Sequence, residues 1–257
     1  MYDLFSNDYD RFVNWKSRLA LEMPFIEKLL AAHPSTASVP KKVLDSACGT
    51  GMHALAIAKL GFEVVGADFS GEMIAKARSN SVEIGLKARF EVIGFGSLAK
   101  NLGAGQFDAV LCLGNSLPHL HTQNEVDETL KDFASCLRPG GLLLIQNRNF
   151  DAVMAKKERW MEPQTHQEEK SEWVFQRFYN FEPDGLIQFN IVTLKRSGNS
   201  SWESSVSSTH LRPQLQKALV NTLTTAGFGE IHSFGGLTGD LFVPLTSGNL
   251  VLTATKS

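Results

Sequence analysis

The sequence has no concentrated positive charge. Its 25 lysines and arginines are balanced by 27 aspartates and glutamates, which gives a formal net charge of -2. The longest basic cluster, Lys156, Lys157 and Arg159, is short and interrupted. Because nucleic-acid binding needs clustered Lys and Arg to neutralise phosphates, we expect no nucleic-acid partner.

Long apolar runs are absent from the sequence as well. No segment approaches the roughly 20 apolar residues that cross a bilayer. The first residues, which include Asp3, Asp8, Asp10 and Arg11, are too charged for the core of a signal peptide. We therefore expect no membrane partner and a cytoplasmic location.

Cysteine is scarce, with only three in 257 residues. Cys48, Cys112 and Cys136 lie in apolar surroundings, with no CxxC pair and no histidine at the spacing of metal ligands. The sequence predicts reduced thiols in or near the core, and it predicts no metal site.

What the sequence does contain, from residue 43 onward, is an alternation of strands and helices. Apolar strands are predicted at residues 43–44, 62–67, 90–93, 107–113 and 142–147. Helices are predicted at residues 54–60, 72–80 and 124–137. This alternation is typical of right-handed crossovers and of a mostly parallel sheet covered on both faces, an α/β doubly wound fold.

The pattern divides the chain into four parts. Residues 1–39 form an N-terminal helical lid, 40–150 a ligand-binding core, 151–210 an antiparallel β insertion, and 211–257 the completion of the core sheet. The insertion is predicted from period-two aromatic and aliphatic residues on both sides of a Glu-Pro-Asp-Gly turn at 182–185. We expect it to lie over the functional edge of the core.

A glycine-bearing turn follows the first predicted strand. Gly49, Gly51 and Ala54 allow a tight turn and a close approach of the backbone to a ligand at a helix N-terminus. This pattern alone fits a bound cofactor or merely a tight strand-to-helix turn. Asp45, just ahead of the glycines, suits a ligand ammonium, and Asp68, after the second strand, suits the two hydroxyls of a ribose.

Residues 43–77 resemble the Rossmann-like methyltransferases that use S-adenosylmethionine. These enzymes have an acid, a GxG turn, and a second acid followed by xSxxM, and the sequence matches each of these features. Phe107-Asp108 and the Leu-Arg-Pro-Gly-Gly run at 137–141 are further matches. The resemblance implies a seven-stranded sheet whose last strand, at 250–255, is antiparallel, with S-adenosylmethionine as cofactor and S-adenosylhomocysteine as product.

The resemblance also implies a set of cofactor-binding residues. Asp45, Ala47, Gly49 and Gly51 would contact the methionine end, and Asp68 the ribose. Gly94 stands where these enzymes usually have an acid for the adenine amino group, so adenine would be held by stacking on Phe69 or Phe95. The full predicted set is Tyr9, Arg18, Asp45, Ala47, Gly49, Gly51, Asp68, Phe69, Met73, Gly94, Phe95 and Leu113.

Two further runs resemble the glycine and sarcosine N-methyltransferase group. The run Gly-Asn-Ser-Leu-Pro-His-Leu at 114–120 matches GNSxxHL, and Arg-Asn-Phe-Asp at 148–151 matches RNYD. By this resemblance Arg148 binds an acceptor carboxylate, while Arg18 clamps the cofactor carboxylate and Tyr9 caps the cofactor. Asn115 would orient the acceptor, and His119 would remove a proton from a hydroxyl acceptor because its ordinary pKa lies near neutrality.

Each of these residues also has a purely structural interpretation. Asn115 and His119 fit a turn that satisfies backbone groups, Arg148 fits an ion pair with Asp151 or with the insertion, and Tyr9 and Arg18 fit a plain surface.

The predicted function is methyl transfer to a small-molecule acceptor, a nitrogen of an amino-acid-like compound. The alternatives are methylation of oxygen or of a larger metabolite, and a non-catalytic protein that binds S-adenosylmethionine. A nicotinamide dehydrogenase is disfavoured by Asp45 and by the final antiparallel strand. The sequence leaves open whether the protein is a monomer or a homo-oligomer.

Overall fold

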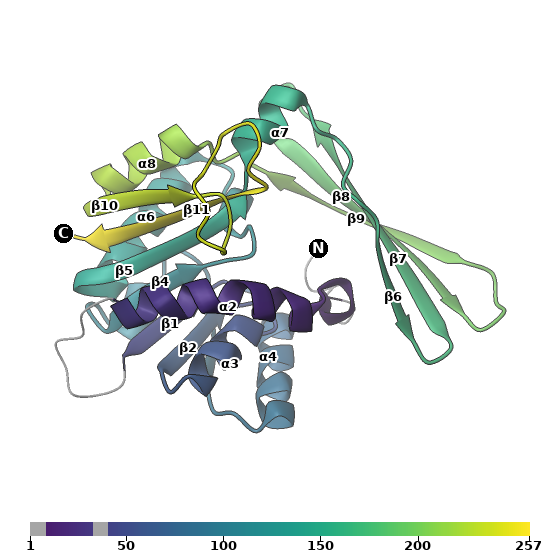
Figure 1. The fold of residues 1–257 in the computed structure, drawn as a ribbon, viewed down its shortest axis with the longest axis horizontal. Helices are drawn as coiled ribbons and strands as arrows, with labels where there is room; N and C mark the ends of the chain where they lie inside the picture. Colours follow the sequence, from purple (N-terminus) through teal and green to yellow (C-terminus); the bar gives the residue numbers. More distant parts are fainter. Residues whose placement is uncertain (1–8, 33–40) are drawn as a thin grey trace.

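The computed structural model describes residues 9–32 and 41–257, and its core is a seven-stranded sheet in the order β10-β11-β5-β4-β1-β2-β3 (Figure 1). The strands are β1 (Lys42–Ser46), β2 (Glu63–Asp68), β3 (Arg89–Val92), β4 (Phe107–Cys112), β5 (Leu137–Arg148), β10 (Phe228–Phe234) and β11 (Asn249–Lys256). Strand β11 runs antiparallel to the other six strands, and it pairs with both β5 and β10. This confirms the predicted fold class.

Helices cover both faces of this sheet, as apolar strands buried on both sides require. One face packs against α2 (Trp15–Ala32), α3 (Met52–Lys59) and α4 (Gly71–Ile84). The other face packs against α5 (Leu98–Leu102), α6 (Gln123–Cys136) and α8 (Gln216–Thr225). The start of α6 is fixed by a capping box, in which Thr122 and Glu125 satisfy each other's backbone N–H groups.

The N-terminal segment packs against both the core and the second sheet. The C-terminal half of α2 belongs to the core, because Ile26 and Leu30 are buried against the sheet. Residues 9–12 form a helical turn at the other end of the segment, beside the second sheet. Residues 1–8 and 33–39 of the predicted lid lie outside the described residues.

The predicted insertion is a separate antiparallel sheet in the order β6-β7-β8-β9, which projects away from the core (Figure 1). It follows α7 (Phe150–Lys156) and comprises β6 (Gln164–Glu168), β7 (Ser171–Phe181), β8 (Ile187–Ser197) and β9 (Glu203–Leu211). The hairpin of β7 and β8 matches the predicted period-two pattern across residues 182–185. Helix α7 and strand β6 were not predicted.

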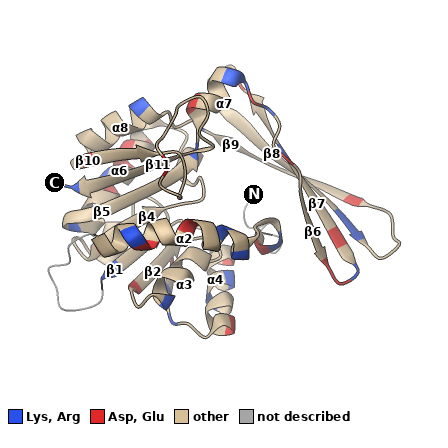
Figure 2. Ribbon diagram, viewed as in Figure 1, with Lys and Arg blue, Asp and Glu red and all other residues tan. Residues whose placement is uncertain are grey.

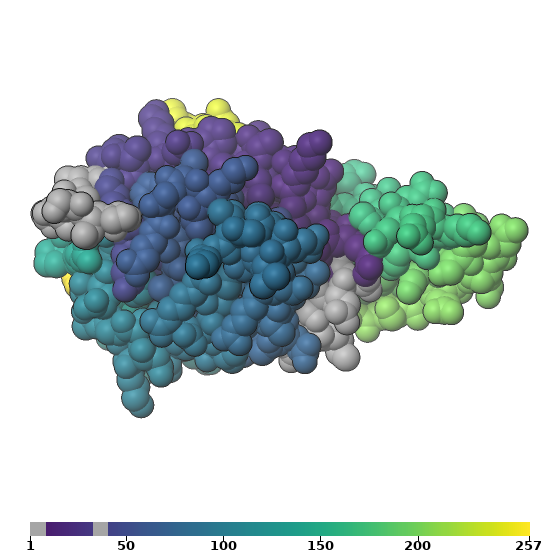
Figure 3. Space-filling view, turned by 90° about the horizontal axis from the view of Figure 1, so that it is seen from below, coloured from purple at the N-terminus to yellow at the C-terminus, as the bar shows by residue number. Residues whose placement is uncertain are grey.

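Two apolar clusters join this second sheet to the rest of the molecule. Phe150 and Val153 of α7 pack against Tyr179 and against the start of β8. Phe12 meets Phe175 edge to face, with their ring centroids 5.4 Å apart. In Figure 3, the N-terminal residues, coloured purple, lie between the core and the second sheet.

Three remaining features of the fold are the distribution of charge, the character of the helices and the state of the cysteines. Positive and negative side chains are interspersed along the fold (Figure 2). Within the described ranges, no helix has the length and apolar character needed to span a membrane. Cys112 and Cys136 are buried, Cys48 is half-buried, and all three are free thiols.

Candidate active site

A cavity of about 880 Å³ opens at the carboxyl ends of β1, β2, β4 and β5. Its walls come from the core, from the N-terminal segment and from the second sheet. This position, outside the carboxyl ends of parallel strands, is where doubly wound sheets bind their ligands. Thirteen predicted site residues line the cavity: Tyr9, Arg18, Asp45, Ala47, Gly49, Asp68, Phe69, Met73, Phe95, Leu113, Asn115, His119 and Arg148.

Two predicted residues, Gly51 and Gly94, lie outside the lining. Gly51 has a φ of 78°, and a Cβ there would stand 2.7 Å from the Phe90 ring. Its role is therefore to let the turn pack closely against β3. A Cβ at Gly94 would stand 3.3 Å from the Cβ of Phe69, so a side chain at position 94 would crowd Phe69.

The glycine turn presents backbone to the cavity. Gly49, with a φ of 55°, has open space where its Cβ would be. Ala47 adopts a φ of 61°, which is unfavourable for a residue with a side chain and is typical of functional sites. The turn between β1 and α3 thus forms a smooth surface that a ligand can approach closely.

Asp45, at the end of β1, is a buried carboxylate with spare hydrogen-bonding capacity. Its side chain is 2% exposed, and its Oδ2 has no hydrogen-bond partner among the described residues. Burial, reinforced by the negative charge of Asp68, raises the pKa of Asp45 to about 7. Such a group is suited to meet a ligand cation or hydrogen-bond donor.

Asp68, at the end of β2, is held by two backbone groups. Its Oδ2 accepts a hydrogen bond from Gly49 N at 2.9 Å, and its Oδ1 accepts one from Ser70 N at 2.9 Å. A carboxylate has about four acceptor positions, so one that holds backbone groups can also accept hydrogen bonds from ligand hydroxyls. The neighbouring Phe69 is 66% exposed as a residue and lines the cavity, where a flat apolar group can stack on its ring.

Arg18 belongs to a hydrogen-bonded network that sequence reasoning missed. Its Nε donates to Glu22 at 3.1 Å, and Glu22 Oε2 lies 2.6 Å from His53 Nε2. Burial opposes the charge on Glu22, but the hydrogen bond with His53 and the charge of Arg18 lower its pKa. Burial also lowers the pKa of His53, so a neutral His53 and an ionised Glu22 together orient the Arg18 guanidinium.

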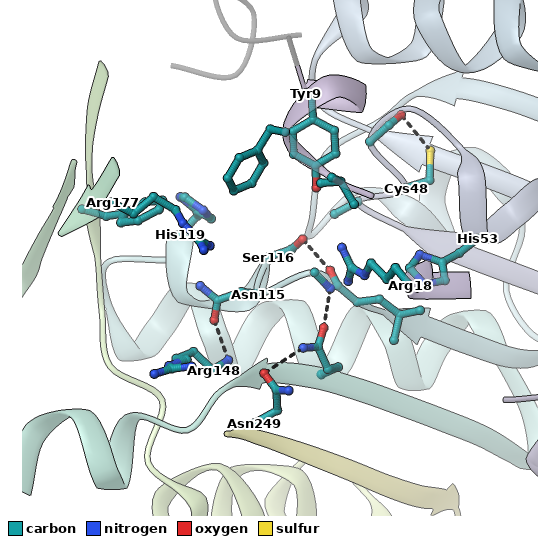
Figure 4. Close-up of a pocket in the computed structure, with 18 of the residues that line it drawn as sticks. Tyr9, Arg18, Cys48, His53, Asn115, Ser116, His119, Arg148, Arg177 and Asn249 are labelled. Carbon is teal, nitrogen blue, oxygen red and sulfur yellow. Dashed lines mark hydrogen bonds between the residues drawn. The ribbon is translucent and has the colours of Figure 1, made fainter. Parts of the chain in front are cut away.

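Asn115 links the loops that follow β4 and β5. The residue has a φ of 64°, and its Oδ1 accepts a hydrogen bond from Arg148 N at 2.9 Å. Its carbonyl therefore satisfies a backbone group, as the structural interpretation expected. The amide nitrogen is turned toward the cavity (Figure 4) and remains available as a donor.

Arg148 pairs with the insertion rather than with Asp151. Its Nη2 donates to Glu158 Oε2 at 2.7 Å, whereas Asp151 accepts a hydrogen bond from the backbone N of Gln216. The Nε of Arg148 is buried without a hydrogen-bond partner among the described residues. Glu158 thus orients the guanidinium of Arg148, and the Nε donor of that guanidinium stays unused.

The structure corrects the expectation for His119, which follows β4 in a short 3₁₀ helix, η1 (Leu117–His119). Burial, together with the nearby His121, lowers the pKa of His119 to about 4. The expectation of a pKa near neutrality is therefore wrong, because it ignored the cost of charging a buried imidazole. At neutral pH the ring is neutral and is a weak base.

The second sheet contributes lining residues that the sequence analysis did not identify. They are Arg177 and Tyr179 of β7 and Phe189 and Ile191 of β8. Period-two alternation places Arg177 and Tyr179 on one face of their strand, so the sequence pattern could have predicted that these two side chains share a surface. Across residues 9–32 and 41–257, no group of three or more His, Cys, Asp or Glu side chains is arranged to hold a metal ion.

Sequence comparisons relate part of the chain to known enzymes. Residues 43–141 match the methyltransferase domain family. The chain is 36% identical over 152 residues to the glycine/sarcosine N-methyltransferase of Halorhodospira halochloris, covering 59% of this chain and 54% of that protein. It is 39% identical over 124 residues to the glycine N-methyltransferase of Rattus norvegicus, covering 44% and 42%. The chain thus matches about half the length, or less, of these curated relatives.

Solved structures match over the whole chain, at low identity. An S-adenosylmethionine-dependent methyltransferase from Clostridium acetobutylicum superposes with a TM-score of 0.79 at 18% identity, covering 100% of this chain and 99% of that one. An S-adenosylmethionine-bound amino pentose methyltransferase from Micromonospora echinaspora gives 0.72 at 20% identity, covering 99% and 97%. Residues 43–141 therefore match the methyltransferase domain family, and the chain as a whole has the fold of the solved S-adenosylmethionine-dependent methyltransferases.

Proposed function

We propose that this protein transfers a methyl group from S-adenosylmethionine to a nitrogen of a small, carboxylate-bearing amino compound. One observation carries the proposal: a single cavity has two buried carboxylates, Asp45 and Asp68, and the guanidinium of Arg148. This charge pattern suits a cationic nucleoside beside an anionic acceptor. The names of the relatives, glycine and glycine/sarcosine N-methyltransferase, support the same acceptor class.

The cavity residues fit S-adenosylmethionine. The unpartnered Oδ2 of Asp45 offers an acceptor for an ammonium group, and Arg18 offers a cation for a carboxylate. Asp68 has capacity for ribose hydroxyls, and the open space at Gly49 leaves room for a ligand against the backbone. When bound, the cofactor supplies a methyl group already activated by a positively charged sulfur.

The chain's own residues then need to align the acceptor rather than to perform acid–base chemistry. Arg148, held by Glu158, anchors a carboxylate with the part of its guanidinium that lines the cavity. The amide of Asn115 orients the acceptor nitrogen, and Tyr9, Phe12 and Tyr179 exclude water from the cavity. With its pKa lowered to about 4, His119 is a weaker base than an ordinary histidine, and transfer from a sulfonium to a neutral amine needs mainly positioning.

A second candidate function, methylation of a larger metabolite, is favoured by the aromatic wall of the cavity. Trp160, Tyr179 and Phe189 line the side formed by the second sheet. Such a wall can accommodate a bulkier apolar acceptor than an amino acid. In that case, large amines without a carboxylate would be methylated faster than glycine or sarcosine.

The proposed function is tested by measuring S-adenosylhomocysteine release on a panel of acceptors. We expect turnover with glycine or sarcosine and none with ethanolamine, which lacks the carboxylate. Arg148→Gln should raise the acceptor KM by about tenfold or more, because a charge-assisted hydrogen bond is lost. Arg89→Gln, on the exposed start of β3, is the matched control and should behave as wild type.

Two results would contradict the proposal. One is the absence of product with every amine on the panel. The other is an Arg148→Gln variant whose acceptor KM and kcat equal those of the wild type.

A further inference from the structure

Arg177 is a charged residue on an otherwise apolar face. On β7 it alternates with Trp173, Phe175 and Tyr179, which are all buried. Its guanidinium carbon lies 4.9 Å from the centroid of the Phe12 ring, and its side chain extends from the second sheet toward the cavity (Figure 4). Arg177 therefore places a cation at the cavity. A strand with a purely structural role would have another apolar side chain at this position.

No carboxylate among residues 9–32 and 41–257 forms an ion pair with Arg177. Its Nε is buried and has no hydrogen-bond partner there. Two acids of the segment before β6 line the cavity: Glu158 is paired with Arg148, and Glu162 forms no ion pair among the described residues. Partly burying a guanidinium without an ion-pair partner is unfavourable, and the positive charge of Arg148 adds to the cost. Burial and Arg148 accordingly lower the pKa of Arg177.

Arg148 and Arg177 line the same cavity and come from two different parts of the fold. Arg148 comes from the end of β5 in the core, and Arg177 comes from the second sheet. Each side chain lines the cavity and has an Nε without a hydrogen-bond partner among the described residues. A ligand with one carboxylate satisfies one of these cations and leaves the other unpaired, whereas a ligand with two carboxylates satisfies both.

We infer that Arg177 is a second anion-binding residue of the acceptor site, and that the acceptor is an amino compound with two carboxylate groups. This inference rests on the proposed function and narrows its substrate class. Arg148 holds the carboxylate nearer the reacting nitrogen, and Arg177 holds the distal one. Tyr179 and Phe189 cover the carbon chain between them.

The inference is tested with two small acids that differ only in the second carboxylate. Glutarate and butyrate are titrated calorimetrically into the protein saturated with S-adenosylhomocysteine. We expect the wild type to bind glutarate about tenfold or more tightly than butyrate, since one extra charge-assisted pair forms. Arg177→Gln should abolish this preference without changing the affinity for butyrate, and Arg148→Gln should weaken the binding of both acids.

Two further variants guard against a structural explanation. Arg177→Lys keeps the charge and should retain part of the preference for glutarate. Arg196→Gln, on the same sheet but outside the cavity lining, should bind both acids as the wild type does. Melting temperatures of all variants report on folding.

The inference is overturned if the wild type binds both acids equally, or if Arg177→Gln keeps the preference for glutarate. A failure of the proposed function is a separate result. If S-adenosylhomocysteine does not bind, the cofactor assignment fails, and the comparison of the two acids on the unliganded protein still decides the role of Arg177.

Discussion

Asp45 is a residue of this cavity whose burial lowers the stability of the fold. Its folded-state pKa of about 7 lies well above its ordinary value of 3.8. The folded chain therefore holds an extra proton between these pH values, and stability falls as pH rises from about 4 to about 7. A pKa shift of this size corresponds to a loss of on the order of 4 kcal/mol in the free energy of unfolding once the pH is above both pKa values. The cost is consistent with a residue whose position is set by a ligand rather than by folding.

We predict that Asp45→Asn stabilises the unliganded protein at pH 8. The amide never ionises, so the cost of burying a charge disappears. The gain in melting temperature over wild type should shrink toward zero near pH 4, where the wild-type carboxyl is protonated in both states. Thermal unfolding from pH 4 to pH 8 measures this, and Glu27→Gln on the exposed face of α2 serves as the control. A stability difference that does not change with pH would contradict the assigned pKa.

The positions of the predicted site residues could be read from the sequence where they depend on a local motif. Asp45, Asp68, Asn115 and Arg148 all follow parallel strands, so they meet at one edge of the sheet whatever their neighbours are. Their roles stay predictions. The ordinary pKa assumed for His119 was wrong because burial depends on tertiary packing that one segment does not reveal.

At the scale of elements, Asp10 ties the N-terminal segment to the glycine turn. It accepts hydrogen bonds from Thr50 Oγ1 at 2.7 Å, from Trp15 Nε1 at 2.8 Å and from Asn80 Nδ2 at 3.2 Å. Thr50 lies in the turn, and Asn80 lies on α4. One carboxylate thus connects three segments beside the cavity.

We predict that Asp10→Ala loosens this connection and speeds release of the cofactor. Three donors lose their acceptor at once, so residues 9–14 should open more often over the cavity. Release of S-adenosylhomocysteine, followed by stopped flow, should be roughly three- to tenfold faster, as expected for the loss of about 1 kcal/mol. Glu27→Ala should leave the rate unchanged, and an unchanged rate in Asp10→Ala would exclude a closing role for the segment.

The elements that were predicted and those that were missed differ in how locally they are encoded. Strands such as β4, with five of six residues buried, have continuous apolar runs that identify them in isolation. Strand β10 has one fully buried residue, and β6 has none. Strands of this kind form because neighbouring strands offer backbone hydrogen bonds. Their own sequences do not indicate this pairing, so they could not be predicted from sequence alone.

At the scale of the whole molecule, the cavity is an interface between parts that are far apart in the chain. Glu22 and His53 come into contact because α2 packs on α3. Arg177 belongs to the second sheet, which comes after residues 40–150 in the sequence. The sequence predicted that an antiparallel insertion would lie near the functional edge, but not which of its side chains would face the cavity. That choice depends on how the second sheet is rotated against α7 and residues 9–12.

The central claim is that this cavity binds S-adenosylmethionine, and calorimetric titration with S-adenosylhomocysteine tests it most directly. We predict binding at one site per chain, competition by S-adenosylmethionine, and a large loss of affinity in Asp68→Ala, because the ribose hydroxyls lose their acceptor. At a hundredfold excess over Kd, the ligand should stabilise the fold by about 2.7 kcal/mol. The absence of both binding heat and thermal stabilisation with either nucleoside would contradict the account.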